Sequence, residues 1–190
     1  MQIEFFWKEA LGIEDALLVE ALSSVSEIVQ VKKGEILVRQ GEVQAWITLI
    51  IEGVFRGYYL NDEGREVTDC FGFRLGEPAM ACQNLHEPAE ITVVAAADSL
   101  CLRFPAEAMT ELCQRHPQLI QVYDMLLVEG IKRHQTIKEA LRHLDLEGRY
   151  QWFLREYPGL IDTVRHQDIA SFLGVTPQSL SRVRGRVKRK

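Results

Sequence analysis

The end of the chain places side chains that read nucleic-acid bases beside a run of positive charge. Arg182 follows Gln178 by four positions and Ser179 by three in "VTPQSLSRVRGRVKRK", so a helix presents the three residues on one side. Glutamine can form two hydrogen bonds with adenine and arginine can form two with guanine, which is the chemistry of base reading in the major groove. The pattern predicts that these three residues contact DNA bases.

The charge around this stretch contrasts with the rest of the chain, whose formal net charge is -5. Residues 1–130 carry 9 basic and 21 acidic side chains, whereas residues 131–190 carry 13 basic and 6 acidic ones. An acidic front and a basic back indicate two domains, of which the basic one suits a polyanion. Contacts to the DNA backbone are expected from Thr176, Ser181, Arg184, Arg186, Lys188 and Arg189.

A helix-turn-helix motif is the element that would position these residues. A first helix from about His166 to Leu173 leads to Gly174, which adopts the left-handed backbone of a tight turn at no steric cost. Thr176 can cap a second helix that starts with Pro177. Apolar residues would hold the two helices together: Ile169, Leu173, Val175, Leu180 and Val183. An αα-hairpin without a nucleic-acid role is the alternative.

A long helix is predicted before this motif, from about Gln118 to Leu144, and a shorter one follows in "LEGRYQWFLREYPG". The long helix has an apolar stripe with residues three or four apart: Ile120, Tyr123, Leu127, Ile131, His134, Ile137 and Leu141. Such a stripe packs either on its own domain or on a twin helix. We expect the first five of these residues to form the seam of a homodimer, with packing inside the chain as the alternative.

The region from Ser26 to Phe104 has the pattern of an antiparallel β domain. Short β-branched and aromatic runs are separated by glycine-containing turns, and "LNDEGRE" predicts a hairpin in which Gly64 takes a positive φ. No helices alternate with these strands, which favours a sandwich or barrel over a parallel sheet. With a helix predicted over residues 3–22, the fold class is α+β: an N-terminal antiparallel β jelly roll, a long dimerisation helix and a C-terminal all-α helix-turn-helix domain.

Other classes of protein find little support. No apolar run reaches the roughly 18 residues that span a membrane, and the N-terminus lacks the features of a secretory signal, so a cytoplasmic protein is expected. The cysteines form no CxxC pair and are expected to be reduced thiols: Cys70, Cys82, Cys101 and Cys113. The predicted strands hold no histidine for a cupin metal site, so we expect no metal, no cofactor and no enzyme activity. A small-molecule sensor or cupin-like barrel without a DNA role is the alternative function.

The order of elements resembles the Crp/Fnr superfamily of bacterial transcription regulators, especially the shorter members common in Bacteroidetes. "KKGEILVRQGE", Glu52-Gly53, Asp62 with Gly64, and "DIASFLGVTPQSLSR" carry the resemblance. It implies a cyclic-nucleotide-binding-like jelly roll with its N-terminal helix at 1–117, a dimerisation helix at 118–144 and a helix-turn-helix DNA-binding domain at 145–190. The implied function is sequence-specific transcription regulation. The implied partners are double-stranded DNA, a second copy of the chain, RNA polymerase and an unidentified small-molecule effector.

The resemblance also implies an effector pocket at Gly76 and Glu77. In cyclic-nucleotide-binding members this glutamate bonds the ribose, and an arginine about ten residues on neutralises the phosphate. Here that position falls near Ala89 and Glu90, where there is no cation, so we predict no response to cyclic AMP. The candidates for a substitute positive charge are Arg74 and His86.

Three further departures from the family pattern concern other sensing modes and the recognition helix. The chain has no cysteine before Cys70, so an N-terminal iron–sulfur cluster is not expected. About seven residues follow the recognition helix, which leaves little room for the family's β-wing, and the basic tail is expected to take over its backbone contacts. The positions where the family usually has Arg, Glu and Arg are here Pro177, Gln178 and Arg182, so a different target sequence is expected.

Overall fold

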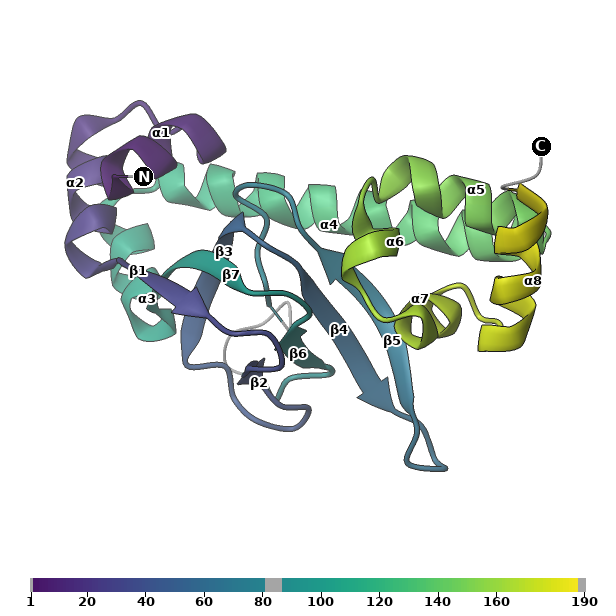
Figure 1. The fold of residues 1–190 in the computed structure, drawn as a ribbon. Helices are drawn as coiled ribbons and strands as arrows, with labels where there is room; N and C mark the ends of the chain where they lie inside the picture. The colour runs from purple at the N-terminus through teal and green to yellow at the C-terminus, as the bar shows by residue number, and fades with distance from the viewer. Residues whose placement is uncertain (1, 81–86, 188–190) are drawn as a thin grey trace.

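The computed structural model describes residues 2–80 and 87–187, with a β domain flanked by N-terminal and C-terminal helices (Figure 1). The strands are β1 (Glu27–Val31), β2 (Ile36–Val38), β3 (Trp46–Glu52), β4 (Phe55–Leu60), β5 (Glu66–Gly72), β6 (Thr92–Ala95) and β7 (Ser99–Pro105). The helices are α1 (Ile3–Leu11), α2 (Ala16–Val25), α3 (Ala106–Arg115), α4 (Gln118–His143), α5 (Leu146–Glu156), α6 (Leu160–Thr163), α7 (His166–Phe172) and α8 (Pro177–Val187). The predicted α+β class is confirmed.

The strands form two antiparallel sheets that enclose one part of the core. One sheet has the order β1-β7-β3 and the other β2-β6-β4-β5. Strands β4 and β5 form the predicted hairpin, and Gly64 has a φ of 71° at its turn. Side chains from both sheets meet between them, among them Ile50, Phe55 and Cys101. Because β5 is the outer strand of its sheet, one of its edges is available to a neighbouring element.

The N-terminal segment differs from the single helix predicted over residues 3–22. Gly12, with a φ of 65°, ends α1, and its N–H donates to the carbonyl of Lys8 at 3.0 Å. The Asp15 carboxylate then starts α2 by accepting from the N–H of Leu18 at 2.9 Å. The apolar periodicity continues across both helices, which conceals the break. Both helices pack on β3 and β7, where Trp7 lies edge-on to Phe104.

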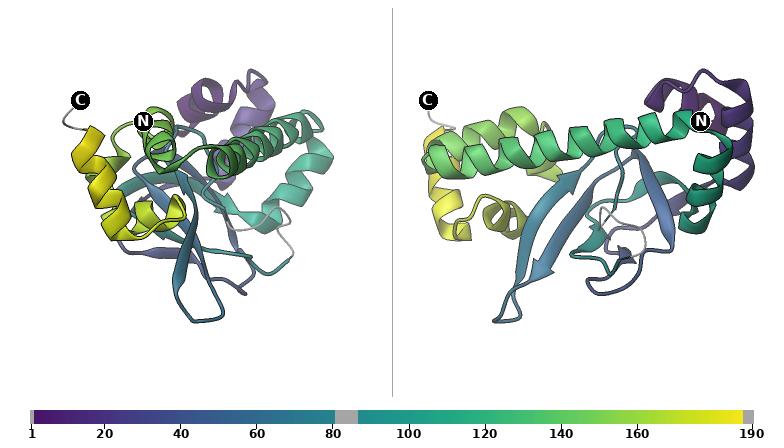
Figure 2. Two further views of the ribbon diagram at one scale, coloured as in Figure 1. Left: turned by 90° about the vertical axis from the view of Figure 1, so that its right-hand side faces the viewer. Right: turned by 180° about the vertical axis from the view of Figure 1, so that it is seen from behind.

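Helix α4 matches the predicted long helix and runs from the N-terminal helices to the C-terminal ones (Figure 2). Its apolar residues differ in burial along the length of the helix. Ile137 is buried and Leu141 packs against the same cluster, whereas Ile120 and Ile131 are 47% and 51% exposed. The C-terminal end of the stripe is therefore covered within the chain, because this end of the helix also packs on the C-terminal helices.

The C-terminal helices share a hydrophobic core with the larger sheet. The ring of Phe71 on β5 meets Phe172 of α7 at 5.2 Å and Phe153 of α5 at 6.3 Å between centroids. Val54 and Ile137 belong to the same cluster. The packing is thus continuous across the predicted boundary between residues 144 and 145, and the bounds of the three domains stay predictions.

Candidate nucleic-acid interface and effector pocket

The helix-turn-helix motif has the local geometry that its sequence predicts. Gly174 has a φ of 68°, and the N–H of Val175 donates to the carbonyl of Ala170 at 2.9 Å to close the turn. The hydroxyl of Thr176 accepts from the N–H of Ser179 at 3.2 Å, which caps α8. Leu180 is fully buried and fixes α8 against its neighbours, as does Val183. The first helix, α7, ends at Phe172 rather than Leu173, a difference within ordinary fraying.

The predicted base-reading residues lie together on α8. Gln178 and Arg182 are exposed and Ser179 is half-buried. The Arg182 guanidinium donates to the Ser179 hydroxyl at 3.2 Å, so the side chains lie on one side of the helix. Helix α8 lies at the end of the molecule opposite α1 and α2 (Figures 1 and 2). This arrangement presents two hydrogen-bonding side chains of the kind that read base edges.

The predicted backbone-contacting residues fall into three groups. Thr176 is exposed and serves as the cap of α8. Ser181 and Arg186 are exposed, and Arg184 is half-buried next to α5, where its charge acts on Tyr150. Lys188 and Arg189 lie outside the described residues.

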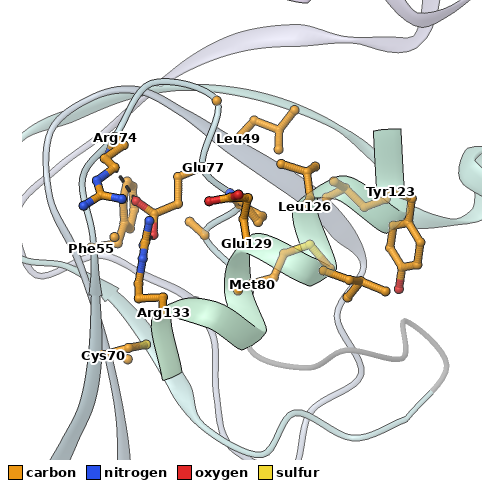
Figure 3. A pocket seen from close by; sticks show the side chains of 18 of the residues that line it. Leu49, Phe55, Cys70, Arg74, Glu77, Met80, Tyr123, Leu126, Glu129 and Arg133 are labelled. Atoms are coloured by element: carbon orange, nitrogen blue, oxygen red, sulfur yellow. Dashed lines mark hydrogen bonds and ion pairs between the residues drawn. The ribbon is translucent and has the colours of Figure 1, made fainter. Parts of the chain in front are cut away.

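A cavity of about 960 Å³ lies between the β domain and α4. Figure 3 shows its polar centre, where Arg133 extends from α4 toward Glu77. Apolar side chains from the sheets, the N-terminal helices and α4 form most of the surrounding wall, including Trp7, Leu49, Phe55, Met80 and Leu126. Three of the residues named for the effector pocket, Gly76, Glu77 and Arg74, line this cavity, and their role in binding an effector stays a prediction. His86 lies outside the described residues.

Glu77 is already held by groups of this chain. Its carboxylate accepts from the backbone N–H groups of Phe73 and Arg74 at 3.0 and 3.1 Å. It also forms an ion pair with Arg133, whose side chain is 23% exposed against 12% for Glu77. The sequence reasoning missed Arg133. Its position four residues before the buried Ile137 was the available signal, since residues four apart share a helix face.

Burial changes the acid–base behaviour around this ion pair. Desolvation, followed by the nearby charge of Arg74, lowers the pKa of Arg133. Desolvation also raises the pKa of Tyr157, which Arg133 partly offsets. Cys70 lines the same cavity, and desolvation and Asp69 raise its pKa to about 12. Cys70 is therefore a neutral thiol at physiological pH, as expected for a packing residue.

The region expected to bind a cyclic phosphate carries no cation among the described residues. Ala89 is buried, and Glu90 is exposed and lines the cavity. The guanidinium of Arg74 lies 5.6 Å from the ring centroid of Phe73. The positively charged residues of the described cavity wall are instead Arg74 and residues of α4, near Glu77.

The five predicted seam residues lie on α4 with different exposures. Ile120, Ile131 and His134 are exposed, whereas Tyr123 and Leu127 are half-buried and line the cavity. Val128, also on α4, is 47% exposed. An apolar surface thus follows the side of α4 that the rest of the chain leaves uncovered, next to the open side of the cavity.

Two further observations concern metal and membrane. Within residues 2–80 and 87–187, no three His, Cys, Asp or Glu side chains gather in a way that would hold a metal ion. None of the described helices has the length and apolar content to cross a bilayer.

The chain is similar in sequence and in fold to known regulators. Residues 28–116 match the cyclic nucleotide-binding domain. The chain is 24% identical over 184 residues to the transcriptional activator protein anr of Pseudomonas aeruginosa, covering 88% of this chain and 75% of that protein. FixK2 from Bradyrhizobium japonicum has a similar structure, with a TM-score of 0.77, 16% identity and coverage of 87% and 85% of the two chains. A protein of Eubacterium rectale assigned to the Crp/Fnr family has a TM-score of 0.74, 22% identity and coverage of 92% and 83%.

This chain carries a cyclic nucleotide-binding domain and is similar to regulators of the Crp/Fnr family. The relatives that the chain matches are regulators of transcription and not enzymes. The order of a cyclic-nucleotide-binding fold, a long helix and C-terminal helices is that of Crp/Fnr structures. The narrower likeness to the shorter members of Bacteroidetes stays a prediction.

Proposed function

We propose that this chain is a Crp/Fnr-type transcription regulator that acts in the cytoplasm as a homodimer. It binds specific DNA sequences with α8 and does not respond to cyclic AMP. The observation that carries the proposal is the capped, exposed helix α8 with Gln178 and Arg182 on one side. Crp/Fnr regulators bind DNA, typically as dimers. The proposed DNA-binding segment covers residues 145–190, with 118–144 as the dimerisation helix and 1–117 as the effector-type domain.

Base reading is assigned to Gln178, Ser179 and Arg182, and phosphate contact to the flanking residues. A bidentate arginine–guanine contact contributes roughly 1–3 kcal/mol of discrimination against a wrong base. Thr176, Ser181, Arg184 and Arg186, with the basic tail, would supply contacts that carry no sequence information. Contact with RNA polymerase belongs to the same proposal.

Assembly is assigned to the exposed side of α4. Two copies pairing along this helix would bury the apolar residues that the single chain leaves in solvent. The two α8 helices would then face half-sites about 34 Å apart, which is one turn of DNA. Ile131→Glu tests this better than a change at the half-buried Leu127, because a charge at an exposed site leaves the fold of the chain intact. We expect the intact protein to sediment as a dimer at micromolar concentration and the variant as a monomer.

The rejection of cyclic AMP is assigned to two features of the cavity. Glu77 is occupied by Arg133 and two backbone N–H groups, and the wall at Ala89 and Glu90 offers the phosphate no positive charge. Calorimetry with cyclic AMP is expected to show no binding below millimolar concentration. A micromolar dissociation constant would overturn this part of the proposal.

The experiment for DNA binding selects sequences from a random duplex pool with the intact protein. We expect a pseudo-palindromic site bound at least a thousandfold more tightly than random DNA, the lower end of the usual specificity ratio. Fluorescence anisotropy on the selected and random duplexes gives that ratio. Equal affinity for both would refute sequence-specific binding.

A further inference from the structure

A partly buried cluster of four charged side chains joins α7 to the β domain. Arg56 of β4 and Glu66 of β5 come from the sheet, and Arg165 and Asp168 come from the start of α7. Arg56 is 2% exposed and Asp168 is 5% exposed. The two arginines balance the two carboxylates, so the cluster carries no formal net charge.

The contacts within the cluster fix the position of each group. The Arg56 guanidinium donates from Nη1 to Glu66 at 2.6 Å and from Nε to the Thr68 hydroxyl at 2.8 Å, and Nη1 lies 3.4 Å from Asp168. Asp168 accepts two hydrogen bonds from Arg165, at 2.8 and 3.0 Å. Arg165 also lies 3.7 Å from Glu66. Asp168 therefore holds an arginine of its own helix and one of the sheet.

The same side of α7 makes two further contacts with β5. The backbone N–H of Thr68 donates to the hydroxyl of Ser171 at 3.0 Å, which satisfies a donor of the outer strand. The ring of Phe172 packs against Phe71. Positions 165, 168, 171 and 172 thus form one face of the helix, and that face follows the edge of the sheet.

Helix α8 packs in the same core as this face. Its buried residues Leu180 and Val183 lie in the same core cluster as Phe172 and Phe71. Whatever holds α7 on β5 therefore also determines where the side chains of α8 point. An apolar contact alone tolerates small rotations, whereas a buried pair of charges loses most of its interaction when it is displaced.

We propose that Arg56 and Asp168 are positioning residues for DNA binding: their buried contact holds α7 on β5 and so fixes the direction in which α8 is presented. The inference rests on the proposed function only in its consequence for DNA. Its structural part concerns the orientation of α8 and is measurable without DNA. The Arg56–Asp168 pair defines the orientation of α8 more than it stabilises the fold, since buried ion pairs are often replaceable by apolar pairs without loss of stability.

The test replaces both charges by apolar side chains of similar size, Arg56→Met with Asp168→Leu. Glu66 and Arg165 stay solvated, because their side chains are 44% and 55% exposed. Lys33 and Gly185 are each replaced by an amino acid with a ketone side chain, and a spin label is attached to each ketone. The two labels report the distance between the β domain and α8. Labelled chains are diluted with unlabelled chains so that each dimer holds at most one pair of labels. Arg103→Met, which removes an ion pair with Glu27 inside the β domain, is the matched control.

We expect one narrow distance distribution for the wild type and for the control, and a broad distribution for the double variant. The melting temperature of the double variant should lie within a few degrees of that of the wild type. DNA affinity should fall at least tenfold in the double variant and stay unchanged in the control. An unchanged narrow distribution in the double variant would overturn the inference. If the wild type itself binds no DNA, the proposed function fails, while the distance measurement still decides the role of the cluster.

Asp168→Asn provides a second variant in case the double variant does not fold. It keeps the shape of the side chain and removes the charge that faces Arg56. A distribution broader than that of the wild type supports the inference, and an identical one contradicts it.

Discussion

The two helices of the helix-turn-helix motif carry charge in opposite ways. On α7, Asp168 is 5% exposed and lies within hydrogen-bond or ion-pair distance of two arginines. On α8, Arg182 is exposed and donates to the hydroxyl of Ser179, with no carboxylate paired to it among the described ion pairs. The charge on α7 thus forms ion pairs within the protein, whereas the positive charge on α8 is available to a ligand.

This difference corresponds to two requirements of a helix-turn-helix that binds DNA, namely exposed side chains and a fixed orientation. A recognition helix needs side chains in water that are free to meet a base or phosphate, which makes them poor sources of folding stability. Its orientation must then come from elsewhere, and here it comes from the opposite face of the partner helix. Changes at the buried residues of α7 should alter stability or orientation, and changes at the exposed residues of α8 should alter DNA binding alone.

Phe172→Ala should have the largest effect. The side chain is 2% exposed and contacts rings from β5 and α5, so its loss leaves a cavity in the shared core. We expect the free energy of unfolding to fall by about 3–5 kcal/mol. Urea denaturation at fixed chain concentration measures this. Phe5→Ala, at a 53% exposed position, should change it by less than about 0.5 kcal/mol. A loss below about 1 kcal/mol at Phe172 would show that α7 is not part of the core.

Asp168→Ala alone should cost about 3 kcal/mol of unfolding free energy, the lower end for a broken buried ion pair. The lower end applies because Glu66 still pairs with Arg56. Glu111→Ala, which breaks an exposed pair with Arg115 on α3, should cost less than about 1 kcal/mol in the same assay. Equal losses of unfolding free energy at the two sites would contradict the expected difference between a buried and an exposed ion pair.

Arg182→Ala should leave the unfolding midpoint unchanged and weaken binding to the selected DNA site by roughly 1–3 kcal/mol. The physical reason is the loss of a two-point contact to one base. Anisotropy on single-base variants of the site should show relaxed preference at one base pair. The assignment is wrong if affinity for random DNA falls by the same factor.

Arg186→Ala should have the smallest effect. This residue is exposed near the end of α8, and its expected partner is a phosphate. Binding should weaken equally on selected and random DNA, and the slope of log affinity against log salt should drop by about one. Salt titrations on both duplexes compare it directly with Arg182→Ala. A loss confined to the selected site would make Arg186 a base reader.

Local features were predictable because they depend on residues close in the sequence. The turn at Gly64, the cap at Thr176 and the left-handed Gly174 follow from the backbone preferences of a few neighbouring residues. The break at Gly12 was missed because the apolar periodicity continues through it. Helical spacing alone places Gln178 and Arg182 on one side of α8, and their contact with bases stays a prediction.

The sequence by itself determined the order of elements, the helix-turn-helix motif and the exposed face of α8, since each is a short-range pattern. Only the tertiary structure decided which charges became buried partners: Arg56 with Asp168, and Arg133 with Glu77. An arginine on a strand or a helix looks the same in sequence whether it meets water or a distant carboxylate. The choice depends on how a sheet edge and a helix face pack together, and that is set by the whole core rather than by neighbouring residues.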